Sequence, residues 1–149
     1  GLVDVYMPDF KLWGTQGSRR YLLAPDYPGV ARRAVAEMHA QVGDLRVDEE
    51  GVARRGILVR HLVMPGMLED TRAIMGWLAS LSRDTYVNVM DQYRPAWKAG
   101  TDRRFADIAR GVSTEEMEEA HESARTAGLW RLDTRWRALH PRLSDILRI

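Results

Sequence analysis

The strongest indication of the fold is GILVRHLVM, residues 56–64, a run that is apolar almost throughout. Arg60 and His61 interrupt it, and Pro65 and Gly66 end it. Strands of a parallel sheet that is covered on both faces have this near-continuous apolar composition, whereas half-covered strands alternate. The run therefore predicts a parallel strand that is covered on both faces.

Strands and helices are predicted to alternate around this run. The expected elements are a buried strand at 2–8, a loop with a short helix at 12–27, a helix from Pro28 to a stop at Gly43, a β-hairpin at 44–56, a helix at 68–81 and a strand at 85–93. The buried stripe of the first helix is expected to hold Val30, Ala34, Met38 and Val42. This order of elements is that of a parallel α/β sheet.

The composition changes after the last predicted strand. Ser113 and Glu116 have the spacing of a capping box, which predicts a helix that ends at Gly128. We therefore expect three parallel strands and two helices at 1–99, followed by a C-terminal helix and tail at 100–149.

Composition limits the classes of function. The 149 residues are 45% hydrophobic and 29% charged, so the chain can bury a core, and the net charge of +1 gives no field that would favour nucleic acid. The absence of cysteine excludes disulfides, zinc thiolate sites and an iron–sulfur cluster bound by this chain. No apolar run has the length of a membrane span, so we expect a cytoplasmic protein. Because Gly1 opens directly into a predicted strand, we expect a piece of a longer protein.

Polar residues gather where the predicted strands end. Ligands bind at the carboxyl ends of parallel strands, and these ends hold Asp9, Lys11, Arg60, Asn88, Asp91, Gln92 and Tyr93. Asp9 and Lys11 lie on the face of Val3, Val5 and Met7, with roughly 7 Å between their Cα atoms, which is too far for a tight ion pair by default. An acid, a lysine and an arginine would suit a zwitterionic ligand, because a guanidinium binds carboxylates in bidentate fashion.

Spacing alone leaves other interpretations open. A charged pair at a strand end is more often a solvated surface than a ligand site. Arg60 inside an apolar strand needs a partner, so a structural Asp9–Arg60 pair is an equal alternative to a ligand role. His61 is expected to pack on the opposite face, and His39, His121 and His140 have no metal-site spacing.

Three segments, taken in order, resemble a known family. VDVYMPDFK (3–11), ILVRHLVMPG (57–66) and YVNVMDQYRPAWKA (86–99) are similar to the later half of the radical S-adenosylmethionine enzymes related to the pyruvate formate-lyase activating enzyme. Residues 24–56 and 113–133 resemble an uncharacterised branch of homologs of that enzyme. The resemblance covers residues 1–133.

This resemblance implies a fold and a set of cofactor contacts. The chain would be the C-terminal half of a partial (β/α)6 TIM-like barrel, with an inserted β-hairpin and a C-terminal helical extension. Asp9, Lys11 and Arg60 fall on an acid, a lysine and an arginine that contact S-adenosylmethionine in the family. Gln92 and Tyr93 are weaker candidates for cofactor contacts, since the activating enzyme has a histidine where Tyr93 stands. The candidates for the substrate face are Asn88 and Asp91.

The sequence departs from the family in lacking its CxxxCxxC motif, whose cysteines bind a 4Fe–4S cluster. In an intact parent that cluster would cleave S-adenosylmethionine to methionine and a 5′-deoxyadenosyl radical, which abstracts hydrogen from a protein or small-molecule substrate. We therefore expect this chain to be inactive alone and to pair with a missing N-terminal half of the barrel. The alternative is a cluster-less α/β binding or assembly module without catalytic activity. An arginine-rich nucleic-acid binder fits less well, because the arginines are dispersed among acids.

Overall fold

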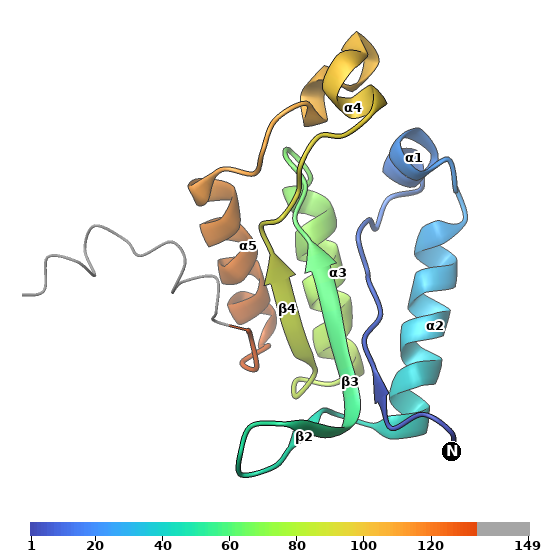
Figure 1. Cartoon of the computed structure of the whole chain (residues 1–149), viewed down its shortest axis with the longest axis vertical. Helices are drawn as coiled ribbons and strands as arrows, with labels where there is room; N and C mark the ends of the chain where they lie inside the picture. Colours follow the sequence, from blue (N-terminus) through green and yellow to red (C-terminus); the bar gives the residue numbers. More distant parts are fainter. Residues whose placement is uncertain (134–149) are drawn as a thin grey trace, which may run out of the picture.

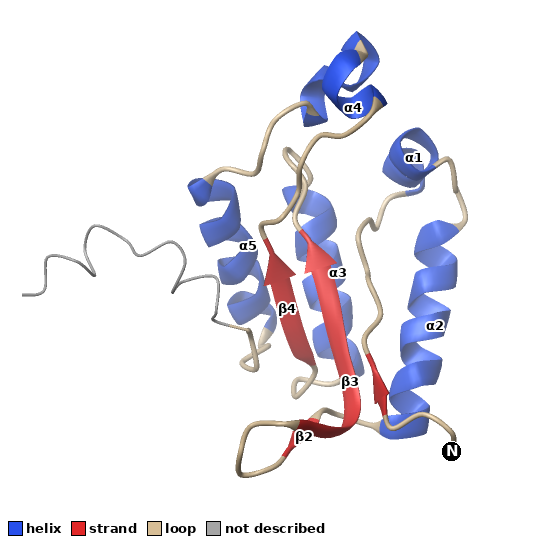
Figure 2. Ribbon diagram, viewed as in Figure 1, coloured by secondary structure: helices blue, strands red, loops and turns tan. Residues whose placement is uncertain are grey.

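The computed structural model describes residues 1–133 and shows an α/β fold with an open sheet (Figures 1 and 2). The elements, in chain order, are β1 (Val5–Tyr6), α1 (Thr15–Gly17), the π-helical turn η1 (Ser18–Leu22), α2 (Tyr27–Val42), β2 (Arg46–Val47), β3 (Ala53–Leu62), α3 (Leu68–Leu81), β4 (Tyr86–Met90), α4 (Lys98–Thr101), the 3-10 helix η2 (Arg103–Ile108) and α5 (Thr114–Ala127).

The central strand is β3, as the apolar run predicts. It pairs in parallel with β1 on one side and with β4 on the other, and β2 pairs antiparallel with its first residues. The predicted strand–helix order and the small β-hairpin are therefore confirmed. The two outer strands are shorter than expected: β1 has two residues and β4 has five, although Asp9 pairs once more with Arg60 beyond the end of β1.

The long helices all contribute to one apolar core against one face of the sheet. That face supplies Ile57, Val59, Val87 and Val89, and the helices supply Val35, Ile74, Met75, Leu78, Met117, Ala120 and Ala124. Figure 1 shows α3 directly behind β3 and β4. Burying this set of aliphatic side chains is the main stabilising contribution to the fold.

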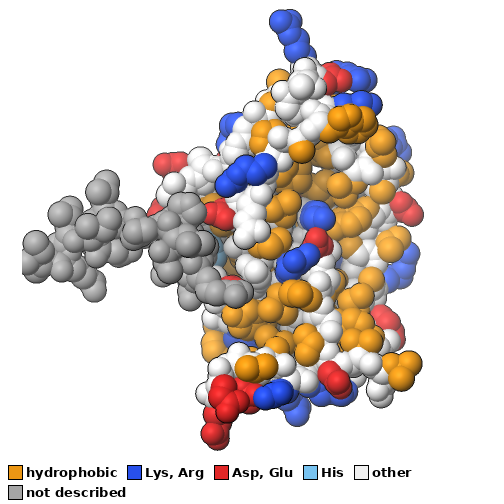
Figure 3. Space-filling model, viewed as in Figure 1, with side chains coloured by type: hydrophobic (Ala, Val, Ile, Leu, Met, Phe, Trp, Pro, Cys, Tyr) orange, Lys and Arg blue, Asp and Glu red, His pale blue; other side chains and the backbone are white. Residues whose placement is uncertain are grey.

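The opposite face of the sheet has no helix over it among residues 1–133. Val3, Val5 and Met7 are exposed, and the side chains between the buried ones on β3 are only half-buried. The predicted burial of the first strand is therefore wrong, and so is the predicted cover on both faces of β3. Figure 3 shows hydrophobic side chains spread over this open face. Because apolar residues occur on both faces of β3, its composition is the same as that of a strand covered on both faces.

The buried stripe of α2 also differs from the predicted one. Ala31, Val35 and Val42 are buried, whereas Val30 is exposed. A strict four-residue spacing drifts by about 40° per step around a helix of 3.6 residues per turn, so it does not follow one face. The predicted stop is confirmed, since Gly43 follows the helix with a φ of 74°.

The later helices match their predicted ranges. α3 covers 68–81. The Ser113 hydroxyl accepts a hydrogen bond from the Glu116 amide at 3.2 Å, and the Glu116 carboxylate accepts one from the Ser113 amide at 2.9 Å, so the capping box is confirmed. Gly128 ends α5 in the left-handed region, as expected.

After α5 the chain returns to the sheet. Val87 donates a hydrogen bond to Arg131 O and accepts one from the Asp133 amide, both at 3.0 Å. Part of the outer edge of β4 is thereby paired. The predicted tail at 134–149 lies outside the described residues. Among residues 1–133, no helix has both the length and the apolar character needed to cross a membrane.

Candidate functional site

Three charged side chains lie together on the open face and are called here the charged cluster: Asp9, Lys11 and Arg60. Arg60 Nε donates to Asp9 Oδ1 at 2.7 Å, and Lys11 Nζ lies 3.0 Å from Asp9 Oδ2. The expectation that Asp9 and Lys11 lie too far apart for a tight ion pair is therefore wrong, because the long lysine side chain reaches the carboxylate. Figure 3 shows basic and acidic side chains grouped amid hydrophobic ones on this face.

The backbone pairing of the strands brings the cluster together. Arg60 donates its amide to Pro8 O at 2.9 Å, and the Phe10 amide donates to Arg60 O at 2.8 Å. This parallel register sets Asp9 directly opposite Arg60, and paired residues in a sheet share one face. Lys11 follows Asp9 by two residues in extended chain, so its side chain lies on the same face.

A tyrosine from α2 fixes the chain at the cluster. The Tyr27 hydroxyl accepts a hydrogen bond from the Lys11 amide at 2.9 Å and donates to Asp9 O at 3.3 Å. Sequence reasoning missed this residue, because a tyrosine before Pro28 has no spacing that indicates a role. Its place next to Asp9 and Lys11 depends on the tertiary fold.

The loop after β1 is fixed by a carboxylate from α3. Asp70 Oδ1 accepts the amides of Trp13 at 2.5 Å and Gly14 at 2.8 Å. The cluster is therefore held between β3, α2 and a loop attached to α3. Such support from several elements limits the motion of side chains that would bind a ligand.

The cluster carries a net positive charge at neutral pH. Burial would raise the pKa of Asp9, but the hydrogen bonds from Lys11 and Arg60 outweigh it and lower the pKa below its usual value. Asp9 is thus ionised and offsets only one of the two cations. The bond to Asp9 uses Arg60 Nε, so the two Nη groups offer further N–H donors. The cluster can bind an anionic group of a ligand without breaking its internal ion pair.

The candidate residues of the last strand separate in space. Asn88 pairs in register with Arg60 and is half-buried on the same face, and Asp91 is half-buried after the strand. Gln92 is exposed. Tyr93 is 8% exposed and donates its hydroxyl to Ile108 O at 2.9 Å, and burial raises its pKa. The structure therefore brings Asn88 next to the cluster and packs Tyr93 into the protein.

His61 lies on the opposite face from the cluster, as predicted. It is 1% exposed, with Nδ1 at 2.7 Å from Phe10 O and Nε2 at 2.9 Å from Thr71 Oγ1. Burial lowers its pKa to about 4, so the ring is neutral at pH 7. Among residues 1–133 no group of three or more potential metal ligands is found.

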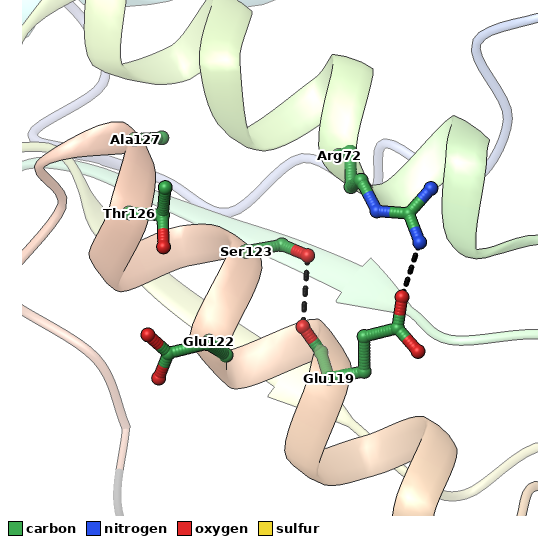
Figure 4. A pocket seen from close by; sticks show the side chains of 6 residues that line it. All are labelled: Arg72, Glu119, Glu122, Ser123, Thr126 and Ala127. Atoms are coloured by element: carbon green, nitrogen blue, oxygen red, sulfur yellow. Dashed lines mark hydrogen bonds and ion pairs between the residues drawn. The ribbon is translucent and has the colours of Figure 1, made fainter.

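A separate hollow of about 380 Å³ lies between α3 and α5, on the outer side of the helices (Figure 4). Arg72 pairs with Glu119 across it, and Ser123 donates its hydroxyl to Glu119 O at 2.8 Å. Glu122 pairs with Arg125 along α5. Charged side chains that pair with each other in this way are typical of a solvated helix surface, so we assign no site here.

Comparison with known proteins gives one informative relative. The uncharacterized protein MJ0674 of Methanocaldococcus jannaschii is 33% identical to this chain over 130 residues. The match covers 87% of this chain and 33% of that protein, so the chain spans about a third of the relative's length. No family model matches the chain, and no solved structure matches it.

Proposed function

We propose that this chain supplies part of the S-adenosylmethionine pocket of a radical S-adenosylmethionine enzyme resembling the pyruvate formate-lyase activating enzyme. The observation that carries the proposal is the charged cluster on the helix-free face of a parallel sheet. Its three residues, Asp9, Lys11 and Arg60, are the ones that the resemblance assigns to the cofactor, and their side chains meet in space. The proposal places the enzyme in the cytoplasm.

The chemistry of the cluster fits one part of the cofactor. S-adenosylmethionine carries a carboxylate, an ammonium, a sulfonium and ribose hydroxyls. The Nη groups of Arg60 and the ammonium of Lys11 can donate to the carboxylate or to a hydroxyl, and the Asp9 oxygens can accept from an ammonium or a hydroxyl. Together with a reduced 4Fe–4S cluster, the cofactor supplies a 5′-deoxyadenosyl radical for hydrogen abstraction. With no cysteine, this chain holds none of that cluster's ligands and acts by binding and orienting the cofactor.

The proposed fold is the C-terminal half of a partial (β/α)6 barrel. The open face favours it, since a barrel would enclose that face, and β1 pairs only with β3 among the described strands. The proposed partner is the N-terminal half, whose first contact would be the free edge of β1. The archaeal relative is longer than this chain, which agrees with the proposal that the chain is part of a longer enzyme.

A second candidate is a cluster-less binding or assembly module. It is favoured by the exposure of Val3, Val5 and Met7, which place apolar surface on the open face. Sedimentation tests it: this candidate predicts a dimer or larger assembly of the 149-residue chain at micromolar concentration. A monomer that melts cooperatively would count against it.

The first experiment is to determine the complete reading frame that encodes this chain and to express its product anaerobically. The proposal predicts a CxxxCxxC motif upstream of Gly1 and iron and sulfide contents that match one 4Fe–4S cluster. A complete product without that motif would overturn the enzymatic proposal, whatever its oligomeric state.

A further inference from the structure

A second cavity, of about 260 Å³, lies between the segment after β1 and the segment after β4. In Figure 1 these segments stand at the end of the molecule toward which β3 and β4 point, with α1 on one side and α4 on the other. Three aromatic side chains line it, Tyr21, Trp97 and Phe105, and none of its lining residues is acidic. It shares no residue with the charged cluster.

Hydrogen bonds tie the two walls of this cavity to each other. Arg20, in η1, donates to Arg104 O at 2.5 Å and to Asp107 Oδ1 at 3.1 Å, both in η2. The Tyr21 hydroxyl donates to Asp107 Oδ2 at 2.6 Å, and the Tyr21 ring lies 6.4 Å from that of Phe105. The cavity is therefore bounded by two segments that hold each other in place.

The charges of the lining leave one cation to attract a ligand. Arg20 is paired with Asp107, and Arg104 with Asp102 at 2.6 Å. Lys98 forms none of the ion pairs found in the described part of the chain, although its charge is one of the causes that lower the pKa of Asp102, and its Nζ lies 4.3 Å from the centre of the Trp97 ring. The net charge of about +1 matches a ligand with a single negative charge.

The backbone at the cavity indicates an apolar ligand body. Within residues 1–133, Leu23 (φ 56°) and Trp97 (φ 49°) are the two non-glycine residues with positive φ, and both line this cavity. Their exposed fractions are 86% and 80%. Leu23 adopts this conformation as the left-handed C-cap that ends η1, whereas the positive φ of Trp97, just before α4, is strained backbone of the kind that is concentrated at ligand sites. A ligand that covers both side chains would remove their apolar surface from water.

We propose that this cavity binds a small organic carboxylate with a flat apolar body. The body packs against Trp97 and Leu23, and the carboxylate pairs with Lys98. An aromatic ring suits the site because aromatic pairs add to simple apolar burial. The cavity is small compared with the pockets that hold drug-sized ligands, which restricts the body to about one ring. This inference does not depend on the proposed S-adenosylmethionine site.

The test is a titration of the full chain with phenylacetate, followed by the indole N–H signal of Trp97 in proton–nitrogen correlation spectra. Trp97→Phe identifies that signal by deleting it. We expect a saturable shift, a loss of affinity of about tenfold or more in Lys98→Gln, and unchanged affinity in Arg19→Gln, which removes an η1 cation that does not line the cavity.

Phenylacetamide and inorganic phosphate are the matched ligand controls, since one lacks the charge and the other lacks the apolar body. Both are expected to bind at least about tenfold more weakly than phenylacetate. The proposal is overturned if the Trp97 signal does not shift, if Lys98→Gln binds like the parent chain, or if either control ligand binds as tightly as phenylacetate.

Discussion

Asp9 and Arg60 are joined twice, once through the parallel pairing of their backbones and once through a 2.7 Å hydrogen bond between Oδ1 and Nε. The backbone pairing fixes the positions of the two Cα atoms, so forming the ion pair costs little further conformational entropy. With Lys11 on the other carboxylate oxygen, the pair forms a preorganised site of net positive charge.

The first prediction concerns the stability of the charged cluster. Asp9→Asn removes the charge that both cations contact, and it should lower the free energy of unfolding at pH 7 by about 0.5–1 kcal/mol, because the cluster is partly exposed. The folded-state pKa of Asp9 is lowered, so its contribution is present above the unfolded pKa and is lost as the pH falls through the folded value. Urea unfolding at neutral and acidic pH should show the two proteins converging in acid.

Asp4→Asn is the control for this measurement, since Asp4 is an exposed aspartate just before β1. It should change the free energy of unfolding by less than about 0.5 kcal/mol. A difference between Asp9→Asn and the parent chain that grows on acidification would contradict the account.

The second prediction concerns His61. Burial lowers its pKa to about 4 from an ordinary value of 6.5, so the unfolded chain binds one more proton between these values. Stability from the neutral ring is therefore complete above pH 6.5 and falls as the pH drops toward 4, by about 1–2 kcal/mol between pH 7 and pH 5. Urea unfolding at these two pH values measures the loss.

His61→Gln should be less stable than the parent chain at pH 7, because two buried hydrogen bonds are disturbed. Its free energy of unfolding should not show the fall between pH 7 and pH 5 that protonation of His61 causes. His39→Gln, at a half-buried position, is the control and should retain the loss between pH 7 and pH 5. An equal pH dependence in His61→Gln and in the parent chain would show that another group is responsible.

The third prediction compares two glycines. A Cβ on Gly56 would lie 2.4 Å from Asp44 O and 2.5 Å from Leu45 Cα, and the φ of Gly56 is 118°. Gly56→Ala should therefore lower the free energy of unfolding by about 2–4 kcal/mol, because rigid backbone blocks the methyl group. Chemical denaturation measures the change.

Gly76→Ala is the matched variant, since a Cβ at this exposed position inside α3 meets no atom within 4 Å. It should raise the free energy of unfolding by about 0.5–1 kcal/mol, which is the helix preference of alanine over glycine. Tolerance of Gly56→Ala would mean that the hairpin does not pack against the start of β3 as described.

The fourth prediction concerns the start of α5. Arg110, through its hydrogen bonds, is the main cause that lowers the pKa of Glu116 to about 2, and Glu116 also accepts the amides of Ser113 and Gly66. Glu116→Ala should cost about 1–2 kcal/mol in thermal or urea unfolding. Glu122→Ala removes only a surface pair and should cost less than about 0.5 kcal/mol; equal costs would be inconsistent with the described cap.

Elements with strong local signals could be predicted from the sequence. The range of α3 follows from its apolar periodicity, and α5 follows from Ser113, Glu116 and Gly128. The open face could not be predicted in this way. Leu58 and Leu62 have the same apolarity whether or not a layer covers them, and composition does not state which layers exist.

The candidate sites show the same division. Asp9 and Arg60 could be proposed together because parallel strands end at one edge, whereas contact with Tyr27 depends on how α2 packs. The second cavity, which is lined by Tyr21, Trp97 and Phe105, could not be predicted from short stretches of sequence. Its walls come from distant segments, since 84 positions separate Arg20 from the carbonyl of Arg104 that it contacts. Sites assembled from distant loops require the tertiary structure.

The central claim is that the charged cluster binds S-adenosylmethionine, and calorimetric titration of the complete reading-frame product with this cofactor tests it most directly. Arg60→Ala and Asp9→Ala should each weaken binding by about tenfold or more, because each removes a charged hydrogen-bonding group. Their iron and sulfide contents should equal those of the parent protein. Arg54→Ala, an exposed arginine on the same strand, should bind normally. Equal affinity in all of these proteins, or no binding in any of them, would contradict the claim.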